Sequence, residues 1–472
     1  MVIVADDMGY GDLSRYNDGR CRSPHLDALA NDGVCLTQHY SGSPVCAPAR
    51  ASLLTGRYPH RTGAIDTLQG RGLDRIALSE QTIADCFRAG GYSTGLVGKW
   101  HNGALDPRYH PNARGFDEFV GFSGGLSDYY DYWLDTNGTE APGDGRYLTD
   151  VLTEHAVAFI RRHAARSFFL VVAYNAPHFP MQAPRHLVDA YLERGETLGA
   201  SLTYAMIESM DTGIGRIDEA LADAGIRDDT IVLFTSDNGP YLGEVEGVSL
   251  DRFNFGLRGA KHYVFEGGIR VPAIIRWPDR WDGGRTVGEM THFSDWLPTL
   301  VRATGVRHHD PSLLDGEDVL PLLEGEHTST QPVRFWQNNR YAPHGQCNAA
   351  MRDGSWKLVR PAIMSLMRVT DGDRTIDRAL NYRRSERIRS VDTSPLPELD
   401  DGERPDVLLF DVESDPFEEH DISAEHPERV ARMTAALDGW FEEVEAERQV
   451  ASRAQESYGD ADVRGTSRSS RP

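Results

Sequence analysis

Short apolar runs alternate with helix-like segments through the first two-thirds of the chain. The apolar runs are bounded by polar or turn residues and predict buried strands at Val2–Ala5, Ser93–Val97, Phe168–Ala173 and Thr230–Phe234. Strands that lack polar alternation and are separated by helices are typical of a sheet covered on both faces. The pattern therefore predicts an α/β fold with a large, mainly parallel sheet flanked by helices.

Three helices are predicted around these strands. The first spans Ser79–Ala89, with Ser79 as its cap and Gly90-Gly91 as its end. The others span Asp150–His163 and about Ser201–Ala224. Open α/β sheets place their sites at the carboxyl ends of the strands, so polar residues that follow the strands directly are expected to meet there.

The pattern changes in the last third of the chain. Asn348–Arg360 predicts a hairpin, in which an Asp-Gly turn joins two strands. Val407–Val412 predicts another strand, and Arg429–Arg448 predicts an amphipathic closing helix. We therefore expect a large α/β domain over residues 1–330 and a smaller α+β subdomain over residues 331–450.

Two segments lack a periodic pattern. Arg368–Arg404 is charged and is expected to be an insertion or a mobile loop, with a place near the substrate as one option. Residues 451–472 are expected to form a disordered tail. Neither segment adds an element to the predicted fold.

Composition and charge exclude several classes of function. The chain has 472 residues, of which 40% are hydrophobic and 26% are charged, as in an ordinary soluble globular enzyme. Its net charge of −23 argues against a nucleic-acid partner. No run of ~18 apolar residues occurs, so no membrane span is predicted. No signal peptide precedes the first strand, so the chain as written is expected to be cytoplasmic, or periplasmic or secreted if the true start lies upstream.

Cysteine and lysine usage narrows the chemistry. The five cysteines lack C-x-x-C spacing, which excludes a disulfide framework and a zinc site. Of the 49 basic residues only three are lysines, Lys99, Lys261 and Lys357. In such an arginine-rich chain, a lysine indicates a position where a compact ammonium on a flexible side chain is required rather than a guanidinium.

Polar residues follow all four predicted strands directly. They are Asp6 and Asp7 after the first strand, Lys99 and His101 after the second, His178 after the third, and Asp237 and Asn238 after the fourth. Three carboxylates and an amide give hard oxygen ligands that suit calcium or magnesium. The sequence therefore predicts a cation site among these residues at one edge of the sheet.

Residues 46–50 have the sequence C-A-P-A-R, and residues 54–57 have the sequence L-T-G-R. This long motif with fixed spacing resembles the maturation motif of the type I sulfatases, an arylsulfatase-like family in the alkaline phosphatase superfamily. The resemblance implies that a formylglycine-generating enzyme oxidises Cys46 to formylglycine, whose hydrated aldehyde attacks sulfur. The plain alternative is a buried free thiol beside a turn proline.

Further motifs of that family appear in family order. They are G-K-W-H at 98–101, P-H-F-P at 177–180, R-G-A-K at 258–261 and E-G-G-I-R-V-P at 266–272. The resemblance implies a small C-terminal antiparallel sheet with a closing helix. It also implies one divalent cation, most often calcium with magnesium as the alternative. The implied cation ligands are Asp6, Asp7, Asp237, Asn238 and the formylglycine from Cys46.

The resemblance also assigns the catalytic side chains. Arg50 would hold the hydrated aldehyde and the cation-site carboxylates in place. Lys99 would bind a sulfate oxygen, and His101 would take a proton from the remaining hydroxyl so that sulfate leaves. His178 and Lys261 would contact sulfate and protonate the departing alcohol.

These assignments imply a sulfuric ester hydrolase that cleaves sulfate monoesters, with sulfated carbohydrates, small or polymeric, as the default substrates. One alternative is a phosphonate or phosphate ester hydrolase of the same superfamily. Another is a non-catalytic protein that binds sulfated ligands. Ser127 aligns loosely with a sulfate-contacting position of the family and is left unassigned, and the oligomeric state cannot be read from the sequence.

Overall fold

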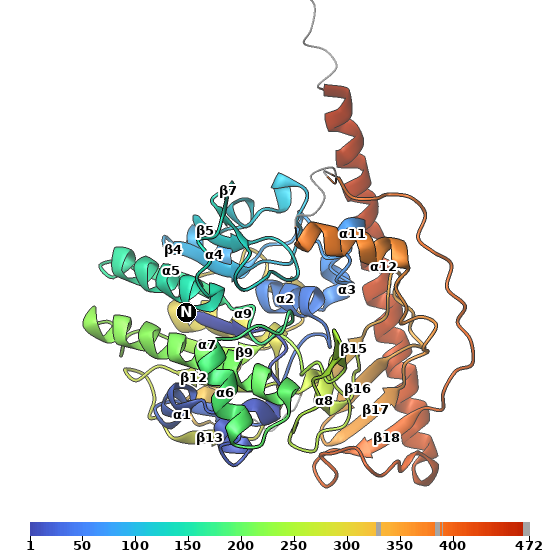
Figure 1. Ribbon diagram of the computed structural model, residues 1–472. Coiled ribbons are helices and arrows are strands. Elements are labelled where there is room, and N and C mark those ends of the chain that lie inside the picture. Colours follow the sequence, from blue (N-terminus) through green and yellow to red (C-terminus); the bar gives the residue numbers. More distant parts are fainter. Residues whose placement is uncertain (327–331, 383–387, 389, 466–472) are drawn as a thin grey trace, which may run out of the picture.

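A ten-stranded sheet forms the centre of the molecule (Figure 1). The computed structural model describes residues 1–326, 332–382, 388 and 390–465, with side chains as far as Val450. In order across the sheet the strands are β13 (Arg285–Val287), β2 (Val34–Leu36), β12 (Ala273–Arg276), β9 (Val232–Ser236), β1 (Val2–Ala5), β8 (Phe168–Ala173), β4 (Ser93–Lys99), β5 (Glu118–Phe122), β6 (Trp133–Thr136) and β7 (Thr139–Pro142). Strands β9, β1, β8, β4 and β5 run parallel, whereas β12, β6 and β7 are antiparallel to their neighbours. The predicted α/β fold with a large, mainly parallel sheet is confirmed.

The central strands contribute side chains to two separate cores, because successive residues of a strand point to opposite faces. Ile3 and Ala5 of β1 belong to one core, whereas Val2 and Val4 belong to the other. The first core is covered by α1 (Pro24–Asn31), α5 (Leu148–His163) and α7 (Leu198–Asp223), and the second by α2 (Cys46–Thr55), α4 (Ile83–Ala89) and α9 (Trp296–Thr304). Both faces of the sheet are therefore shielded from water, which is why its central strands are apolar throughout.

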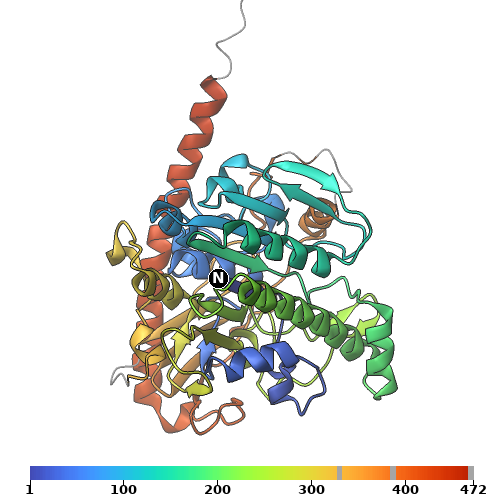
Figure 2. The same cartoon turned by 90° about the vertical axis from the view of Figure 1, so that its left-hand side faces the viewer.

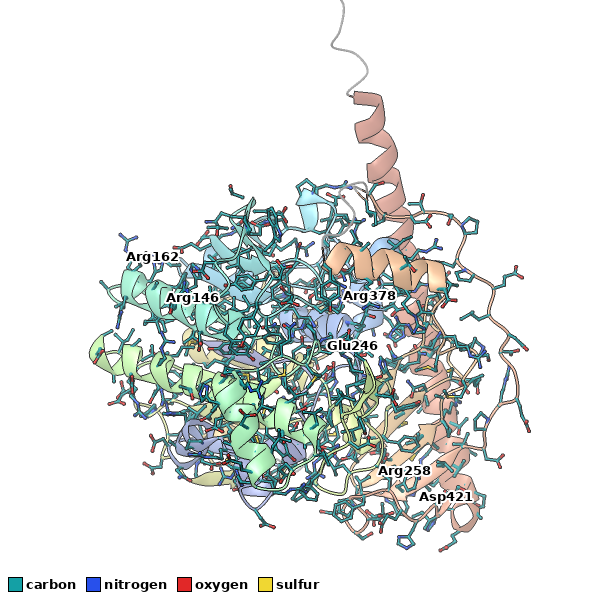
Figure 3. The ribbon with its side chains drawn as sticks, viewed as in Figure 1. Arg146, Arg162, Glu246, Arg258, Arg378 and Asp421 are labelled. Carbon is teal, nitrogen blue, oxygen red and sulfur yellow. The ribbon has the colours of Figure 1, made fainter. Side chains whose placement is uncertain are left out.

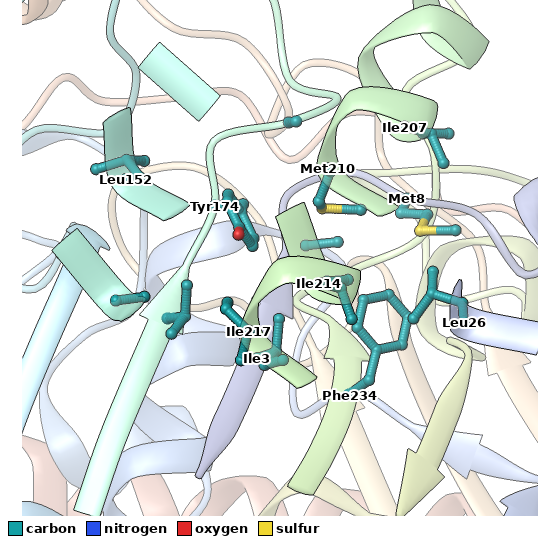
Figure 4. Packing of buried hydrophobic residues seen from close by; sticks show 14 of the residues in the cluster. Ile3, Met8, Leu26, Leu152, Tyr174, Ile207, Met210, Ile214, Ile217 and Phe234 are labelled. Atoms are coloured by element: carbon teal, nitrogen blue, oxygen red, sulfur yellow. The ribbon is translucent and has the colours of Figure 1, made fainter. Parts of the chain in front are cut away.

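Helix α7 shows how such a cover forms. Its residues Met210, Ile214 and Ile217 recur three or four positions apart, so they share one face of the helix. Figure 4 shows Ile214 and Ile217 beside Ile3 of β1, in the same buried cluster. Each fully buried side chain of this kind stabilises the fold by about 1.5–3 kcal/mol relative to its exposed state. The helices predicted over Asp150–His163 and Ser201–Ala224 are confirmed as α5 and α7, within three residues at each end.

The predicted start of α4 is wrong. This helix begins at Ile83 rather than near Ser79. Thr82 Oγ1 accepts a hydrogen bond from the Asp85 N–H, and Asp85 in turn accepts one from the Thr82 N–H. This reciprocal capping box satisfies two free N–H groups, which Ser79 would not achieve from its place in the preceding turn.

A four-stranded antiparallel sheet follows later in the chain. Its strands are β15 (Arg334–Gln337), β16 (Ala349–Asp353), β17 (Trp356–Arg360) and β18 (Leu408–Asp411). β16 and β17 form the predicted hairpin, with Met351 opposite Leu358. Helix α12 (Pro427–Gly465) packs on this sheet and extends past it, as Figures 1 and 2 show. The C-terminal antiparallel sheet is confirmed, and the domain boundary near residue 330 stays a prediction.

Two expectations for the last third of the chain need correction. Arg368–Arg404 is not a loop throughout, because it contains α11 (Asp371–Asn381), whose first turn is capped by Thr370. Residues 451–465 are helical rather than disordered, since α12 continues through them, and extending a helix that has already formed adds one hydrogen bond for each residue that is fixed. Residues 466–472 lie outside the described residues.

The remaining elements are short. They are α3 (Pro59–Thr62), α6 (Arg185–Glu193), α8 (Glu266–Ile269), α10 (Leu320–Leu323), the strand pair β3 (His39–Tyr40) and β14 (Thr291–His292), and the hairpin of β10 (Glu244–Val245) and β11 (Val248–Ser249). Within the described part of the chain, no helix combines the length and the apolar character that crossing a membrane requires.

Candidate active site

Cys46 is the first residue of α2 and lies next to the end of β1. Its Sγ is 3.5 Å from Asp6 Oδ1, 4.0 Å from Asp7 Oδ1 and 3.2 Å from Lys261 Nζ. The residue is only 2% exposed. The amino terminus of a helix carries partial positive charge, so this position favours an anion or a developing negative charge.

Oxygen ligands gather at the adjacent ends of β1 and β9. Asn238 Nδ2 donates to Asp7 Oδ1 at 2.7 Å, whereas the buried Asn238 Oδ1 has no hydrogen-bond partner. Four residues each offer a ligand atom within 4.8 Å of the others: Asp6, Asp7, Cys46 and His178. A hard cation suits the oxygen donors of this site, because it would bind the unpartnered Asn238 Oδ1 and screen the charges of Asp6 and Asp7 from each other.

Each carboxylate of the cluster faces its own cationic side chain. The ion pairs are Lys99 with Asp6 at 2.7 Å, Lys261 with Asp7 at 2.6 Å and Arg50 with Asp237 at 2.8 Å. These pairs balance three negative and three positive charges, so the site can accept a divalent cation together with an anionic ester without a large net charge.

Asp237 is held differently from the prediction that it ligates the cation. One of its oxygens is taken by Arg50, and the other accepts the Asp7 N–H at 3.2 Å. Its oxygens are not in the group of four ligand atoms that lie within 4.8 Å of one another, whereas His178 Nε2 is. A cation role for Asp237 stays a prediction.

Burial and neighbouring charges move the two adjacent carboxylates in opposite directions. Burial, and then Asp237, raise the pKa of Asp6 well above its usual value. Burial also acts to raise the pKa of Asp7, but Lys261 and His178 outweigh it and hold that pKa below its usual range. The charged form of Asp6 is thus disfavoured in the protein alone, and a bound cation would stabilise it.

His101 presents a free nitrogen. Its Nε2 donates to the Thr67 carbonyl at 3.3 Å, so in the neutral ring the lone pair lies on Nδ1. This Nδ1 is buried and has no hydrogen-bond partner. Burial, and then Lys99 and Arg50, lower the pKa of His101 well below its usual value. The ring is therefore neutral at physiological pH and ready to accept a proton.

His178 is oriented by its own neighbour. Its Nδ1 donates to the Phe179 carbonyl at 2.8 Å, and its Nε2 lies 3.7 Å from Asp7 Oδ2. Burial, and then Lys261, lower the pKa of His178. Its Nε2 thus faces the same small space as the Cys46 thiol.

The loop that contains Ser127 contacts both histidines. A Cβ on Gly125 would lie 2.7 Å from the His101 ring, so only glycine allows this contact. Four residues later, Tyr129 Oη donates to the His178 carbonyl at 2.9 Å. The Gly125 N–H donates to Asn381 Oδ1 at 3.0 Å, and Asn381 is the last residue of α11.

Helix α11 therefore reaches the site although its segment shows no clear sequence signal. It also faces the β10–β11 hairpin, where Arg378 and Glu246 lie 3.8 Å apart (Figure 3). Ser127 lines a cavity of about 600 Å³ beside the end of α11, and its Oγ donates to the Asp128 carbonyl. A contact between Ser127 and sulfate stays a prediction.

The sequence matches known families along most of its length. Residues 1–306 match the sulfatase family, and residues 257–363 match the family described as N-sulphoglucosamine sulphohydrolase, C-terminal. Steryl-sulfatase of Mus musculus is 32% identical over 419 residues, which are 69% of this chain and 65% of that protein. N-acetylgalactosamine-6-sulfatase of Homo sapiens is 29% identical, over 93% of this chain and 84% of that protein.

Solved structures agree with the sequence relatives. The crystal structure of Ps i-CgsB in complex with k-i-k-neocarrahexaose has a TM-score of 0.76 and 28% identity, and covers 93% of this chain and 91% of that chain. A family match over residues 1–306 exceeds half of the chain. The predicted family and enzyme class are thereby confirmed: this chain belongs to the sulfatase family, within the alkaline phosphatase superfamily.

Proposed function

We propose that this chain hydrolyses sulfate monoesters of carbohydrates, with formylglycine made from Cys46 and one divalent cation. The observation that carries the proposal is the position of Cys46 Sγ, at the start of α2 and in contact with Asp6 and Lys261. Formylglycine, when present, supplies two hydroxyls as its hydrate: one suits attack on sulfur, and the other suits the later release of sulfate.

The cation would be held by Asp6, Asp7, Asn238 and the residue at position 46, with calcium as the first candidate and magnesium as the alternative. The unpartnered Asn238 Oδ1 supports this assignment. A bound cation lowers the pKa of a coordinated hydroxyl and balances the charge of the sulfate group. The fifth ligand in the proposal is Asp237, despite its pairing with Arg50.

The side chains of the site bind the sulfate group and transfer protons. Lys99 and Lys261 bind sulfate oxygens and stabilise the negative charge of the transferring group. Lys261 holds a proton near the departing alcohol oxygen, because Asp7 and Cys46 outweigh burial and raise its pKa. His178, which is neutral in the protein alone, would donate from Nε2 once that atom is protonated. His101 Nδ1 accepts a proton as sulfate leaves, which its neutral, unpartnered state permits. Arg50 fixes Asp237 and the start of α2.

Carbohydrate sulfates are the proposed substrate class. Relatives of this chain include N-acetylgalactosamine-6-sulfatase, and the solved structure of Ps i-CgsB contains a neocarrahexaose. We also propose that residues 1–330 carry the chemistry and that residues 331–450 support it, since Asn381 reaches the His101 loop from the second part.

The first test is peptide mass spectrometry across Cys46, on protein produced together with a formylglycine-generating enzyme. We expect an aldehyde in place of the thiol, and release of sulfate from a sulfated sugar by the same sample. An intact thiol beside a successfully converted control substrate would contradict the formylglycine step and favour the binding-protein alternative.

A phosphonate or phosphate ester hydrolase is the second candidate. Among the described residues, one buried group of clustered ligand atoms occurs, and the other such group, Asp415 with Glu419 and His420, is largely exposed. A single cation with flanking lysines and histidines suits the lower charge of a sulfate monoester. Rates on matched aryl sulfate, phosphate and phosphonate esters decide between the candidates, and a faster phosphonate reaction would overturn the proposal.

A further inference from the structure

Three aromatic rings stand in a row beside the two proposed proton donors. The rings of His178 and Phe179 lie 4.1 Å apart, those of Phe179 and Tyr241 lie 6.1 Å apart, and those of Tyr241 and His262 lie 6.2 Å apart. The row thus begins at one proposed donor and ends at the neighbour of the other, Lys261. Phe179, Tyr241 and His262 are half-buried, whereas the donors are buried. We call Phe179, Tyr241 and His262 the aromatic wall.

The backbone of the wall is held in place at a conformational cost. His262 has a φ of +81°, a region that non-glycine residues rarely adopt. Its N–H donates to the Pro44 carbonyl at 2.9 Å, and its carbonyl accepts from Asn348 Nδ2 at 2.7 Å. Such strain persists where surrounding contacts enforce it, and it concentrates at functional sites.

Tyr241 is also fixed by its surroundings. Its carbonyl accepts a hydrogen bond from Arg252 Nη1 at 3.1 Å. A Cβ on Gly243 would lie 2.6 Å from Tyr241 Oη, so the glycine lets the tyrosine fold back over its own chain. Fixing the ring before a ligand arrives reduces the entropy that binding must offset.

The wall carries no charge of its own. Burial, and then Lys261 and Arg340, lower the pKa of His262 to about 3, so its ring is neutral at working pH. The positive charge nearby belongs to Lys261, which faces Asp7 and Cys46. Anion binding and ring packing are therefore assigned to different residues: the buried cluster suits sulfate, and the wall suits an uncharged surface.

We propose that the aromatic wall binds the pyranose ring that carries the sulfate, through the C–H face of the sugar. This proposal rests on the proposed function, because it names the part of the substrate that lies next to the sulfate. The row of rings begins at His178 and ends at His262, the sequence neighbour of Lys261, so we place the ring of an ester whose sulfate lies in the cluster beside the wall. Polar side chains that suit sugar hydroxyls line the cavity that contains Ser127, namely Gln69, Ser127, Asp131 and Asn381. The same loop reaches the start of the row, because Tyr129 Oη donates to the His178 carbonyl.

The test compares a ring-bearing ester with a ring-free one. Calorimetry on the full chain with Cys46 unmodified measures the binding of galactose 6-sulfate and of ethyl sulfate, both of which are esters of primary alcohols. We expect Tyr241→Ala to weaken binding of galactose 6-sulfate by about tenfold, because an aromatic contact of ~1.4 kcal/mol is lost. Binding of ethyl sulfate should change less than about twofold.

Two further variants control the measurement. Tyr241→Phe keeps the ring and should bind both esters as the wild type does. Tyr92→Ala removes a half-buried ring that packs on Phe87 at the other end of β4, and should leave both affinities unchanged. Equal weakening for both esters, no weakening for the sugar ester, or no binding of it by the wild type would each overturn the proposal. Binding without turnover after maturation would sink the proposed hydrolysis and leave the wall intact.

Discussion

Lys261 and Lys357 are both buried between acidic neighbours, yet their surroundings differ. Lys357 Nζ lies 2.9 Å from Glu266 Oε1 and 2.9 Å from Glu418 Oε1. The second Glu266 oxygen accepts from Tyr40 Oη, and the second Glu418 oxygen accepts from the Glu266 N–H, each at 2.7 Å. Each charged group of this cluster has an ion-pair partner, although Glu418 Oε1 makes no hydrogen bond, and the cluster links β17 of the small sheet to α8.

The cluster around Lys261 keeps atoms without partners. Asn238 Oδ1 and His101 Nδ1 are both buried and make no hydrogen bond. A buried polar group without a partner costs about 1–3 kcal/mol, so such atoms need an explanation such as a missing ligand. The difference teaches that a buried lysine does not by itself mark a reactive site. The Lys261 cluster differs because an unpartnered amide oxygen lies beside a buried thiol and several potential cation ligands.

The largest expected effect tests the reactive cluster directly. Cys46→Ala should reduce sulfate release by at least about ten-thousand-fold, because the nucleophile is lost. Its thermal midpoint should remain close to that of the wild type. Cys86→Ala, which removes a buried thiol in α4, is the matched control and should keep its activity. Substantial turnover by the Cys46 variant would refute the assignment of the nucleophile.

Lys357→Met tests the paired cluster. Removing this ammonium leaves two buried glutamates facing each other, so the free energy of unfolding should fall by about 3–5 kcal/mol. Activity per folded molecule should persist. Lys261→Met should do the reverse, with turnover lowered about 100-fold or more and a smaller loss of stability in calcium. Denaturant titration and steady-state rates measure both, and a reversed pattern would break the distinction between the clusters.

Removal of the cation tests whether the unpartnered Asn238 Oδ1 binds a cation. Adding calcium to chelated protein at about 100 times its dissociation constant should raise the free energy of unfolding by about 2.7 kcal/mol. Asn238→Leu should diminish this gain. Asp415→Asn changes the exposed group of Asp415, Glu419 and His420 and should leave the gain intact. Equal gains in all three proteins would place the cation elsewhere.

Asn381→Leu tests the contact between α11 and the reactive cluster. Without the Asn381 oxygen, the Gly125 N–H loses its acceptor and the His101 ring loses a fixed support. We expect kcat to fall about tenfold with little change in KM, as for a misplaced general base. The acid limb of the kcat profile should also move upward, because water that enters the loosened site raises the low pKa of His101. Asn381→Asp keeps an acceptor and should restore most of the rate; a purely structural role would leave the pH profile unmoved.

The smallest effect concerns Asp74, next to the reactive cluster. Burial raises the pKa of Asp74 from 3.8 to about 7, and its Oδ2 accepts the Gly103 N–H just after His101. A carboxyl with a higher pKa in the folded chain binds its proton more tightly there, so this contribution to stability falls as pH rises from about 4 to about 7. Between pH 6 and pH 8 the loss should be about 1 kcal/mol. Asp74→Asn should flatten that slope in denaturant titrations, and an unchanged slope would contradict the assignment.

The cluster was largely predictable because strand ends and motif positions coincide. Asp6, His178 and Asp237 each follow a strand of the parallel centre of the sheet, and Lys99 is the last residue of β4. Parallel strands bring their carboxyl ends together. The structure brings these residues into one buried group around Cys46. Their roles in turnover stay predictions.

Other parts were not predictable, for physical reasons. The Gly125–Asn381 hydrogen bond joins residues that are 256 positions apart in the sequence. Helix α11 lies in a segment where the sequence pattern did not predict a helix. The start of α4 depended on which of two nearby residues forms a reciprocal cap, a choice that only local geometry decides. His178 Nε2 lies within 4.8 Å of Asp6, Asp7 and Cys46, whereas Asp237 pairs with Arg50, and the sequence pattern does not encode these distances.

The burial of Cys46 has a consequence for the timing of protein synthesis. Lys261, which lies against the thiol in the finished fold, is translated 215 residues after it. At about 5–20 residues per second, the ribosome needs roughly 10–40 s to reach that point. Over this interval the nascent segment cannot yet be enclosed by its later partners. In the proposed maturation, the oxidising enzyme would therefore reach the thiol while the chain is still emerging or is not yet folded, and a fast-folding variant would shorten this interval.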